Sequence, residues 1–189
     1  MKKINYAFIV IAGIVLFMLS YLLDEKINLF FKNASFPIMG IILGIATNFG
    51  VVALFMLAIP SIILYKKNKS AVFLIWLTFF ISFILAFILK LIVLRQRPTE
   101  TFAYPFTDIL NYSFPSMHSM IVFSLLPALN NHIKKQKYFW ILFACLVSFS
   151  RIYFSFHFLS DVVFGAFAGY FTGCFLLEIY ERRNHGKHK

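Results

Sequence analysis

The chain has 189 residues, of which 61% are hydrophobic and only 13% charged, whereas a soluble domain keeps about a quarter of its residues charged. The apolar residues come in uninterrupted runs, which excludes a water-facing globular domain and predicts a polytopic membrane protein. The net charge of +11 is typical of nucleic-acid binders, but most of the positive charge lies in short clusters between apolar runs, so we expect no nucleic-acid partner. Cys145 and Cys174 lie inside apolar runs without a CxxC spacing, so we expect neither a disulfide nor a metal site.

Six membrane-spanning helices are predicted. The first follows Lys2 and Lys3 as an uncharged run of 18 residues, Tyr6 to Leu23, which is longer than the apolar core of a cleaved signal peptide. The next run, 35–65, is too long for one helix across a ~30 Å hydrocarbon core, so we divide it into an entry piece and a span. Residues 27–32 are expected to form a small helix on the membrane surface. The predicted spans of this single all-α domain, residues 1–189, are 6–23, 48–65, 70–95, 115–131, 138–153 and 158–180.

The basic residues predict the orientation of these spans. If the N-terminus is cytoplasmic, 12 of the 18 basic residues lie in cytoplasmic segments, as the positive-inside rule requires. We therefore expect an integral plasma membrane protein with both termini in the cytoplasm. Among the remaining cations, four stand at the outer ends of spans: Lys90, Arg95, Arg97 and Arg151. Snorkelling to the interface explains Arg95 by itself, but four such cations on separate helices indicate a function.

Three short segments on the predicted outer side carry the chemistry. They read KLIVLRQRP over 90–98, FPSMHS over 114–119 and SRIYFSFHFLSD over 150–161. Lys90 and Arg97 are seven residues apart, so they share one face if the helix persists. An arginine offers a planar fork for phosphate oxygens, and a lysine adds a compact charge. Together with Arg151, these residues predict a phosphate-binding site.

Two histidines accompany these cations. Pro115 suits a first helical turn, whose free N–H groups attract an anion, and Ser116 and His118 follow it. His157 and Asp161 are four residues apart, so on a helix they share a face, and a carboxylate strengthens a histidine as base or nucleophile. Arg151 and His157 are offset by about 600° at 100° per residue, so the chain must turn between them if both contact one substrate. A hairpin between the fifth and sixth spans is predicted at this place.

The three segments resemble the signature of the type 2 phosphatidic acid phosphatase superfamily: K-x6-RP, then PSGH, then SR-x5-H-x3-D. The first and third motifs match at the expected spacing, through Lys90, Arg97 and Pro98 and through Ser150, Arg151, His157 and Asp161. The second motif has Met117 where the family has glycine. The backbone N–H survives this change, but a position that needs a positive φ would strain methionine. We expect activity with an altered fit.

The resemblance implies a role for each residue of the site. His157 attacks phosphorus and forms a phosphohistidine, Asp161 orients it, and His118 protonates the leaving oxygen and later assists water. The phosphoryl oxygens are held by Lys90, Arg97, Ser116, Met117 and Arg151. The resemblance implies no metal and no cofactor.

The implied substrate is a lipid phosphate in the membrane, reached laterally from the bilayer. The resemblance covers polyprenyl diphosphates, phosphatidate and phosphatidylglycerol phosphate, and we favour the carrier-lipid diphosphate. The loop from Thr99 to Phe114 is expected to help choose among them. Two alternatives stay open: a phosphotransferase that uses the same histidine, and a non-catalytic protein that binds or transports lipid phosphates. The sequence leaves the oligomeric state open.

Overall fold

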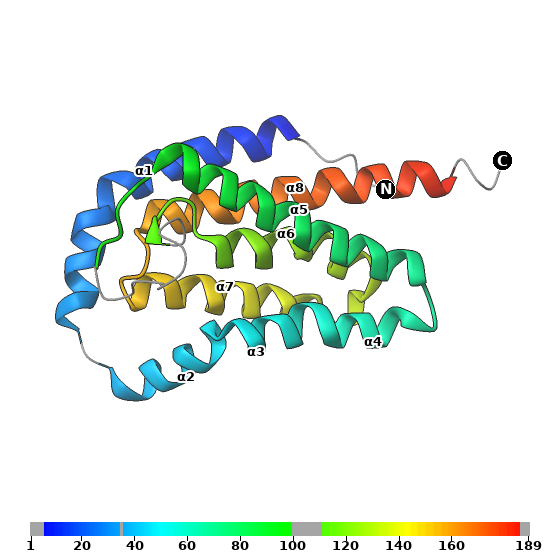
Figure 1. The fold of residues 1–189 in the computed structure, drawn as a ribbon, viewed down its shortest axis with the longest axis horizontal. Coiled ribbons are helices and arrows are strands. Elements are labelled where there is room, and N and C mark those ends of the chain that lie inside the picture. Colours follow the sequence, from blue (N-terminus) through cyan, green and yellow to red (C-terminus); the bar gives the residue numbers. More distant parts are fainter. Residues whose placement is uncertain (1–5, 35, 100–110, 186–189) are drawn as a thin grey trace.

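The structure is a computed structural model that describes residues 6–34, 36–99 and 111–185. Every regular element within these ranges is a helix, which confirms the all-α fold class (Figure 1). The elements are α1 (Tyr6–Asn33), α2 (Pro37–Thr47), α3 (Phe49–Ala53), the π-helical turn η1 (Leu54–Ala58), α4 (Ile59–Tyr65), α5 (Lys69–Val93), α6 (Met117–His132), the 3-10 turn η3 (Lys134–Gln136), α7 (Lys137–Tyr153) and α8 (Leu159–His185).

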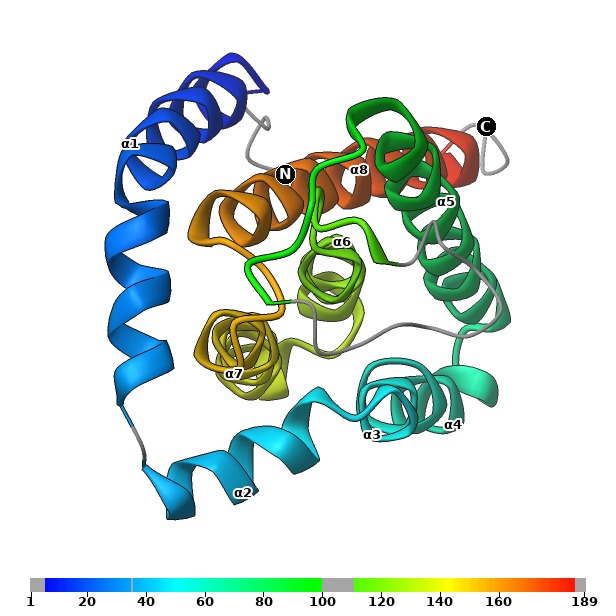
Figure 2. The same ribbon diagram turned by 60° about the vertical axis from the view of Figure 1, so that its left-hand side comes forward.

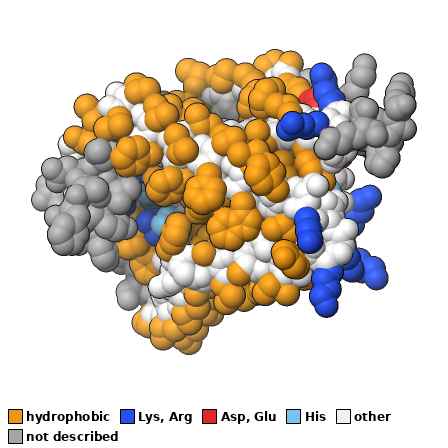
Figure 3. Space-filling view, turned by 45° about the vertical axis from the view of Figure 1, so that its right-hand side comes forward, with side chains coloured by type: hydrophobic (Ala, Val, Ile, Leu, Met, Phe, Trp, Pro, Cys, Tyr) orange, Lys and Arg blue, Asp and Glu red, His pale blue; other side chains and the backbone are white. Residues whose placement is uncertain are grey.

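Among the described residues, three helices are long and apolar enough to cross a membrane: α1, α5 and α8. The pair formed by α2 and the segment 49–65 adds a fourth if it counts as one span, although it is bent by 57°. Helices α6 and α7 have 16 and 17 residues. The number of six spans therefore stays a prediction. Large apolar side chains cover much of the lateral surface, as a membrane protein requires (Figure 3).

The N-terminal part differs from the prediction in one respect. Helix α1 continues without a break to Asn33, so the expected surface helix at 27–32 is its last part. The entry piece of the second run is α2, and Asn48 separates it from α3 because its side chain accepts hydrogen bonds from the amides of Gly50 and Val51. An extended residue that caps the next helix explains the bend after Thr47.

Helix α6 lies in the middle of the bundle, with α5, α7 and α8 around it (Figure 2). Nearly all of its residues from Ser119 to Leu129 are buried, as expected for a helix that is largely apolar around its circumference.

Three glycines at intervals of four residues bring α8 close to α6. A Cβ added at Gly169 would lie 2.1 Å from the carbonyl oxygen of Met120, and one at Gly173 would lie 2.0 Å from that of Ser124. Gly165 meets the carbonyl oxygen of Ser116 in the same way, at 2.7 Å. Small residues at this spacing allow helix backbones to approach closely inside a membrane. The beginnings of α6 and α8 are thereby fixed against each other.

Candidate active site

The three motif segments meet at one end of the bundle, where α5 ends, α6 begins and α7 turns into α8 (Figure 1). We call this the site end. The cations Lys90, Arg97 and Arg151 lie close enough to both His118 and His157 for their charges to act on both imidazoles. The structure thus brings together the predicted cations and the predicted histidines.

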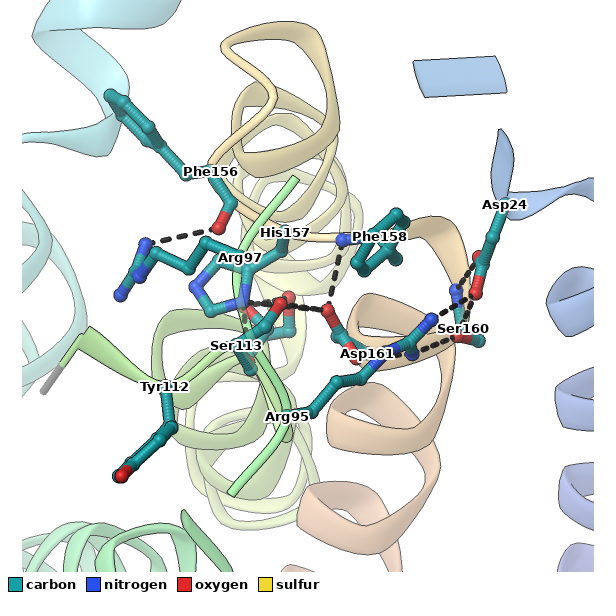
Figure 4. A network of polar contacts seen from close by, with 12 residues as sticks. Asp24, Arg95, Arg97, Tyr112, Ser113, Phe156, His157, Phe158, Ser160 and Asp161 are labelled. Atoms are coloured by element: carbon teal, nitrogen blue, oxygen red, sulfur yellow. Dashed lines mark hydrogen bonds and ion pairs between the residues drawn. The ribbon is translucent and has the colours of Figure 1, made fainter. Parts of the chain in front are cut away.

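His157 is buried in the connection between α7 and α8, and its tautomer is fixed by a main-chain contact (Figure 4). Its Nδ1 lies 2.7 Å from the carbonyl oxygen of Ser113 and 3.9 Å from Oδ2 of Asp161. A carbonyl oxygen only accepts hydrogen bonds, so Nδ1 carries the proton and Nε2 keeps its lone pair. His157 precedes the first residue of α8, so the pair with Asp161 forms at the start of that helix and not along it.

The charge state of His157 follows from its surroundings. Burial lowers the pKa of His157 well below its ordinary value, and the guanidinium groups of Arg97 and Arg151 lower it further. The imidazole is therefore neutral at neutral pH, as a nucleophile must be.

Asp161 is fully buried and accepts hydrogen bonds on both oxygens. Its Oδ2 accepts from the hydroxyl of Ser113 and, at 2.9 Å, from the amide of Phe158. Its Oδ1 accepts from Nη1 of Arg95 at 2.7 Å. Ser113 therefore contacts both partners of the pair, His157 through its carbonyl group and Asp161 through its hydroxyl. Sequence analysis missed Ser113 because it lies outside the three motifs.

Arg95 forms ion pairs with two buried carboxylates, so snorkelling is not needed to explain it. Its Nη2 binds Oδ2 of Asp24 on α1 at 2.7 Å, while its Nη1 binds Asp161 and, at 2.7 Å, the hydroxyl of Ser160 (Figure 4). Asp24 is only 3% exposed. The sequence carried a signal for this ion pair. Asp24 is a carboxylate at the end of the first apolar run, and Arg95 is an arginine close to Arg97.

Lys90 and Arg97 approach the site by different routes. Lys90 lies in the last turn of α5, only 2% exposed, and donates to the carbonyl oxygen of Tyr112. Helix α5 ends at Val93, and Leu94 adopts a left-handed conformation with φ of 51°. The condition under which Lys90 and Arg97 would share one helical face, a helix that persists to Arg97, is therefore not met.

Arg97 lies in the non-helical segment after α5 and still contacts the site. Its Nε donates to the carbonyl oxygen of Asn111 at 2.9 Å, and its Nη1 donates to that of Phe156 at 3.0 Å. The guanidinium plane is thereby held between two chain segments.

The turn predicted between Arg151 and His157 is present. Helix α7 ends at Tyr153, and Ser155 adopts a φ of 52°, which reverses the chain before α8. Arg151 is buried; its Nη1 donates to Oγ1 of Thr47 at 2.7 Å and its guanidinium packs on the ring of Phe156. Thr47, at the end of α2, is a second neighbour that sequence analysis missed.

We predicted that Pro115 lies in the first turn of the fourth span. Helix α6 begins two residues later, at Met117, so Pro115 precedes the helix. Ser116 is the N-cap residue; it is buried, and its amide donates to the carbonyl oxygen of Asp161 at 3.1 Å. His118 is hydrogen-bonded to the backbone of Thr47. The amides at the start of α6 are the groups that attract an anion to a helix N-terminus.

Met117 fits its position without strain. Among the described non-glycine residues, positive φ values occur only at Leu94 and Ser155. The side chain of Met117 packs against the buried apolar cluster of the bundle. The position does not need a positive φ, so the condition under which methionine would be strained is not met.

The described residues contain no group of three or more His, Cys, Asp or Glu side chains arranged to hold a metal ion. The groups that line the candidate site are instead cations, imidazoles and amides, which suit an anionic ligand.

Two solved structures share this fold. A PAP2-type phosphatidylglycerolphosphate phosphatase from Bacillus subtilis is 21% identical, with a TM-score of 0.70 over 91% of this chain and 96% of that chain. LpxE of Aquifex aeolicus is 24% identical, with a TM-score of 0.67 over 82% of this chain and 95% of that chain. No curated protein sequence matches the chain. The family model of the PAP2 superfamily matches residues 71–185, which is more than half of the chain and contains all three motifs, so the chain belongs to the PAP2 superfamily.

Proposed function

We propose that the protein is a metal-independent phosphatase that hydrolyses a lipid phosphate through a phosphohistidine on His157. The observation that carries this proposal is the hydrogen bond from Nδ1 of His157 to the carbonyl oxygen of Ser113. It leaves the lone pair on Nε2, in the field of Lys90, Arg97 and Arg151. A neutral imidazole next to these cations is a nucleophile placed where a phosphate dianion binds.

In the first step, Nε2 of His157 attacks phosphorus as the P–O bond to the lipid breaks. Asp161 stabilises the positive charge that develops on the imidazole, and His118, which takes up a proton when the phosphate dianion binds next to it, gives that proton to the leaving oxygen. In the second step, water attacks the phosphohistidine while His118 accepts a proton from it, and the P–N bond breaks to release inorganic phosphate. Together, the two steps return the enzyme to its starting protonation state.

The charge on the transferred phosphoryl group is stabilised by the surrounding donors. Lys90, Arg97 and Arg151 supply three positive charges, and Ser116 with the amide of Met117 supplies donors at the start of α6. The substitution of the family glycine by Met117 is compatible with activity because its side chain packs into the bundle.

The substrate reaches the site from the bilayer in this proposal. Figure 3 shows basic and histidine atoms in a gap among apolar side chains at the site end. An acyl or prenyl tail can remain in the hydrocarbon while its phosphate enters such a gap. The expected substrate-choosing loop, Thr99 to Phe114, lies mostly outside the described residues.

Among the candidate lipids, we favour a polyprenyl diphosphate carrier, as in the sequence analysis. The similar protein from Bacillus subtilis is described as a phosphatidylglycerolphosphate phosphatase, so phosphatidylglycerol phosphate is the second candidate, before phosphatidate. The outward orientation of the site rests on the distribution of basic residues and is part of the proposal.

The test is phosphate release by the purified protein in detergent with EDTA present, on undecaprenyl diphosphate, phosphatidylglycerol phosphate and phosphatidate. Wild type and His157→Ala are compared, with His132→Ala at the other end of the bundle as the matched control. We expect turnover in wild type and in the control, and none in His157→Ala. Phosphate transferred to an added lipid or sugar acceptor would support the phosphotransferase. Lipid binding that survives His157→Ala, with no turnover in wild type, would support the binding or transport protein.

A further inference from the structure

We propose that Arg95, held by Asp24 of α1, is a positioning residue for the catalytic Asp161. This inference rests on the proposed function, because it assigns a role in the same reaction to a residue of the first motif segment that is not one of its signature residues. It also gives α1 a role in the site, although the match to the family model begins only at residue 71.

The guanidinium of Arg95 joins two buried carboxylates from different helices. Nη1 lies 2.7 Å from Oδ1 of Asp161, and Nη2 lies 2.7 Å from Oδ2 of Asp24. The side chains of these aspartates are 0% and 4% exposed. Ser160 closes the arrangement, since its amide donates to Oδ1 of Asp24 at 2.8 Å and its hydroxyl contacts both Asp24 and Arg95 (Figure 4).

The positive charge of Arg95 compensates the negative charges of Asp24 and Asp161. Two carboxylates buried side by side repel each other, and a cation that is hydrogen-bonded to both compensates them. Without Arg95, Asp161 keeps the donors from Ser113 and Phe158 but loses its ion pair with a permanent cation. The carboxylate would then rotate or take up a proton, and Oδ2 would no longer be held next to His157.

Aromatic rings fix the guanidinium between its two partners. The ring of Phe158 lies 4.2 Å from Cζ of Arg95, and the ring of Tyr21 on α1 lies 5.4 Å away. Contact with ring faces stabilises a cation and restricts its rotation. The fork of Arg95 therefore has a defined orientation, which an ammonium group could not reproduce.

The test measures kcat and KM of Arg95→Gln, Arg95→Lys and Asp24→Asn on the lipid with the highest wild-type turnover. The matched control is Lys32→Ala, since Lys32 also joins α1 to the segment after α5, through the carbonyl oxygen of Pro98, but does not touch Asp161. A misplacement of about 1 Å costs about 100-fold in rate, so we expect Arg95→Gln to lower kcat about 100-fold with KM changed less than about threefold. Arg95→Lys and Asp24→Asn should each lower kcat about tenfold, and Lys32→Ala less than about twofold.

A positioning role is overturned if Arg95→Gln and Asp24→Asn keep the wild-type kcat, or if they raise KM with kcat unchanged. Arg95→Gln is checked for folding by thermal unfolding in detergent. If it does not fold, Asp24→Asn decides the question, because it removes the charge that holds Arg95 but leaves the buried Asp161 paired with Arg95.

A second measurement separates this inference from the proposed function. His157 is phosphorylated with phosphoramidate, a small phosphoryl donor, without any lipid. Suppose that wild type is inactive on every lipid but still becomes phosphorylated on His157, and that Arg95→Gln is phosphorylated about tenfold more slowly or to a lower extent. The positioning role then stands, and the proposed lipid phosphatase activity fails. Equal labelling rates in the two proteins would overturn the positioning role.

Discussion

The motif segments at the site end and the loops at the opposite end of the bundle use the same basic residue types in opposite ways. At the site end, Lys90 and Arg151 are buried, and Arg95 and Arg97 are bound to groups from other segments. At the opposite end, all the described basic residues of the loops and the C-terminal part of α8 are exposed, namely Lys66, Lys67, Lys69, Lys134, Lys135, Lys137, Arg182 and Arg183. Exposed cations are satisfied by water, whereas buried ones need partners or a ligand.

Charge alone therefore does not identify a functional cation in a membrane protein; its burial and its partners do. The ion pair between Arg182 and Glu178 at the opposite end joins residues four apart on one helix, and the arginine is 78% exposed. Such a pair contributes little to stability. The ion pairs of Arg95 join three chain segments, so they fix the relative positions of α1, α8 and the segment after α5.

The largest expected effect comes from Asp161→Asn at the site end. The amide keeps the size of the side chain but removes the charge that stabilises the imidazole and orients its proton, so we expect kcat to fall about 1,000-fold. Steady-state phosphate release measures it. A fall of less than about tenfold would mean that the carbonyl group of Ser113 orients His157 without help from Asp161.

Gly169→Ala tests whether close packing of α6 on α8 supports the site. The added Cβ would meet the carbonyl oxygen of Met120 at 2.1 Å, so the helices must separate. We expect a loss of about 1–3 kcal/mol in stability, measured as a lower Tm in detergent. Gly40→Ala is the control, because its Cβ would make only ordinary contacts with the side chain of Tyr153, at 3.6 and 3.9 Å. An unchanged Tm in Gly169→Ala would contradict this packing.

Ser113→Ala tests the shared contact within the pair. It removes the hydroxyl that donates to Asp161 and leaves the carbonyl group that binds His157. The loss of one donor to a buried carboxylate is expected to lower kcat about tenfold, as measured by phosphate release. An effect as large as that of Asp161→Asn would show that the hydroxyl carries the whole interaction.

The pH dependence of kcat/KM tests the charge state of His157. Its ordinary pKa is about 6.5. Because burial and the neighbouring arginines lower this pKa, the neutral nucleophile persists to more acidic pH, and activity is lost only as pH falls through the lowered value. Arg151→Gln removes one of these charges, so its acid limb should lie at higher pH than that of wild type. Coincident profiles, corrected for ionisation of the substrate phosphate, would contradict the assignment.

The smallest effect is expected at the opposite end. Lys134→Gln together with Lys135→Gln removes two exposed cations, and we expect kcat/KM to stay within about twofold of wild type. A tenfold loss in phosphate release would remove the distinction between the two ends.

The motif spacing predicted which residues meet because each motif is local in sequence and lies at the end of a helix. The spacing did not predict how they meet. Arg97 approaches from a non-helical segment because Leu94 ends α5, and His157 is bound by the main chain of Ser113 because the segment before α6 crosses the connection between α7 and α8. Such contacts depend on the tertiary arrangement and leave no periodic signal.

Two features carried a signal that was not used. Glycines at 165, 169 and 173 have the small-residue spacing of close helix contacts in membranes. Asp24 and Arg95 are residues of opposite charge at the ends of apolar runs, so an ion pair between them could have been predicted. The number of membrane crossings is harder to predict, because α6 and α7 are short and α2 is bent away from α3.

The most direct test of the proposed mechanism is to trap the phosphohistidine on His157. Wild type and His157→Ala are mixed with a lipid carrying labelled phosphate, in EDTA, and quenched in alkali within one turnover. We expect a label on Nε2 of His157 that is stable to alkali, lost in acid and absent from His157→Ala. Turnover by wild type with no label on protein, or with the label on His118, would contradict it.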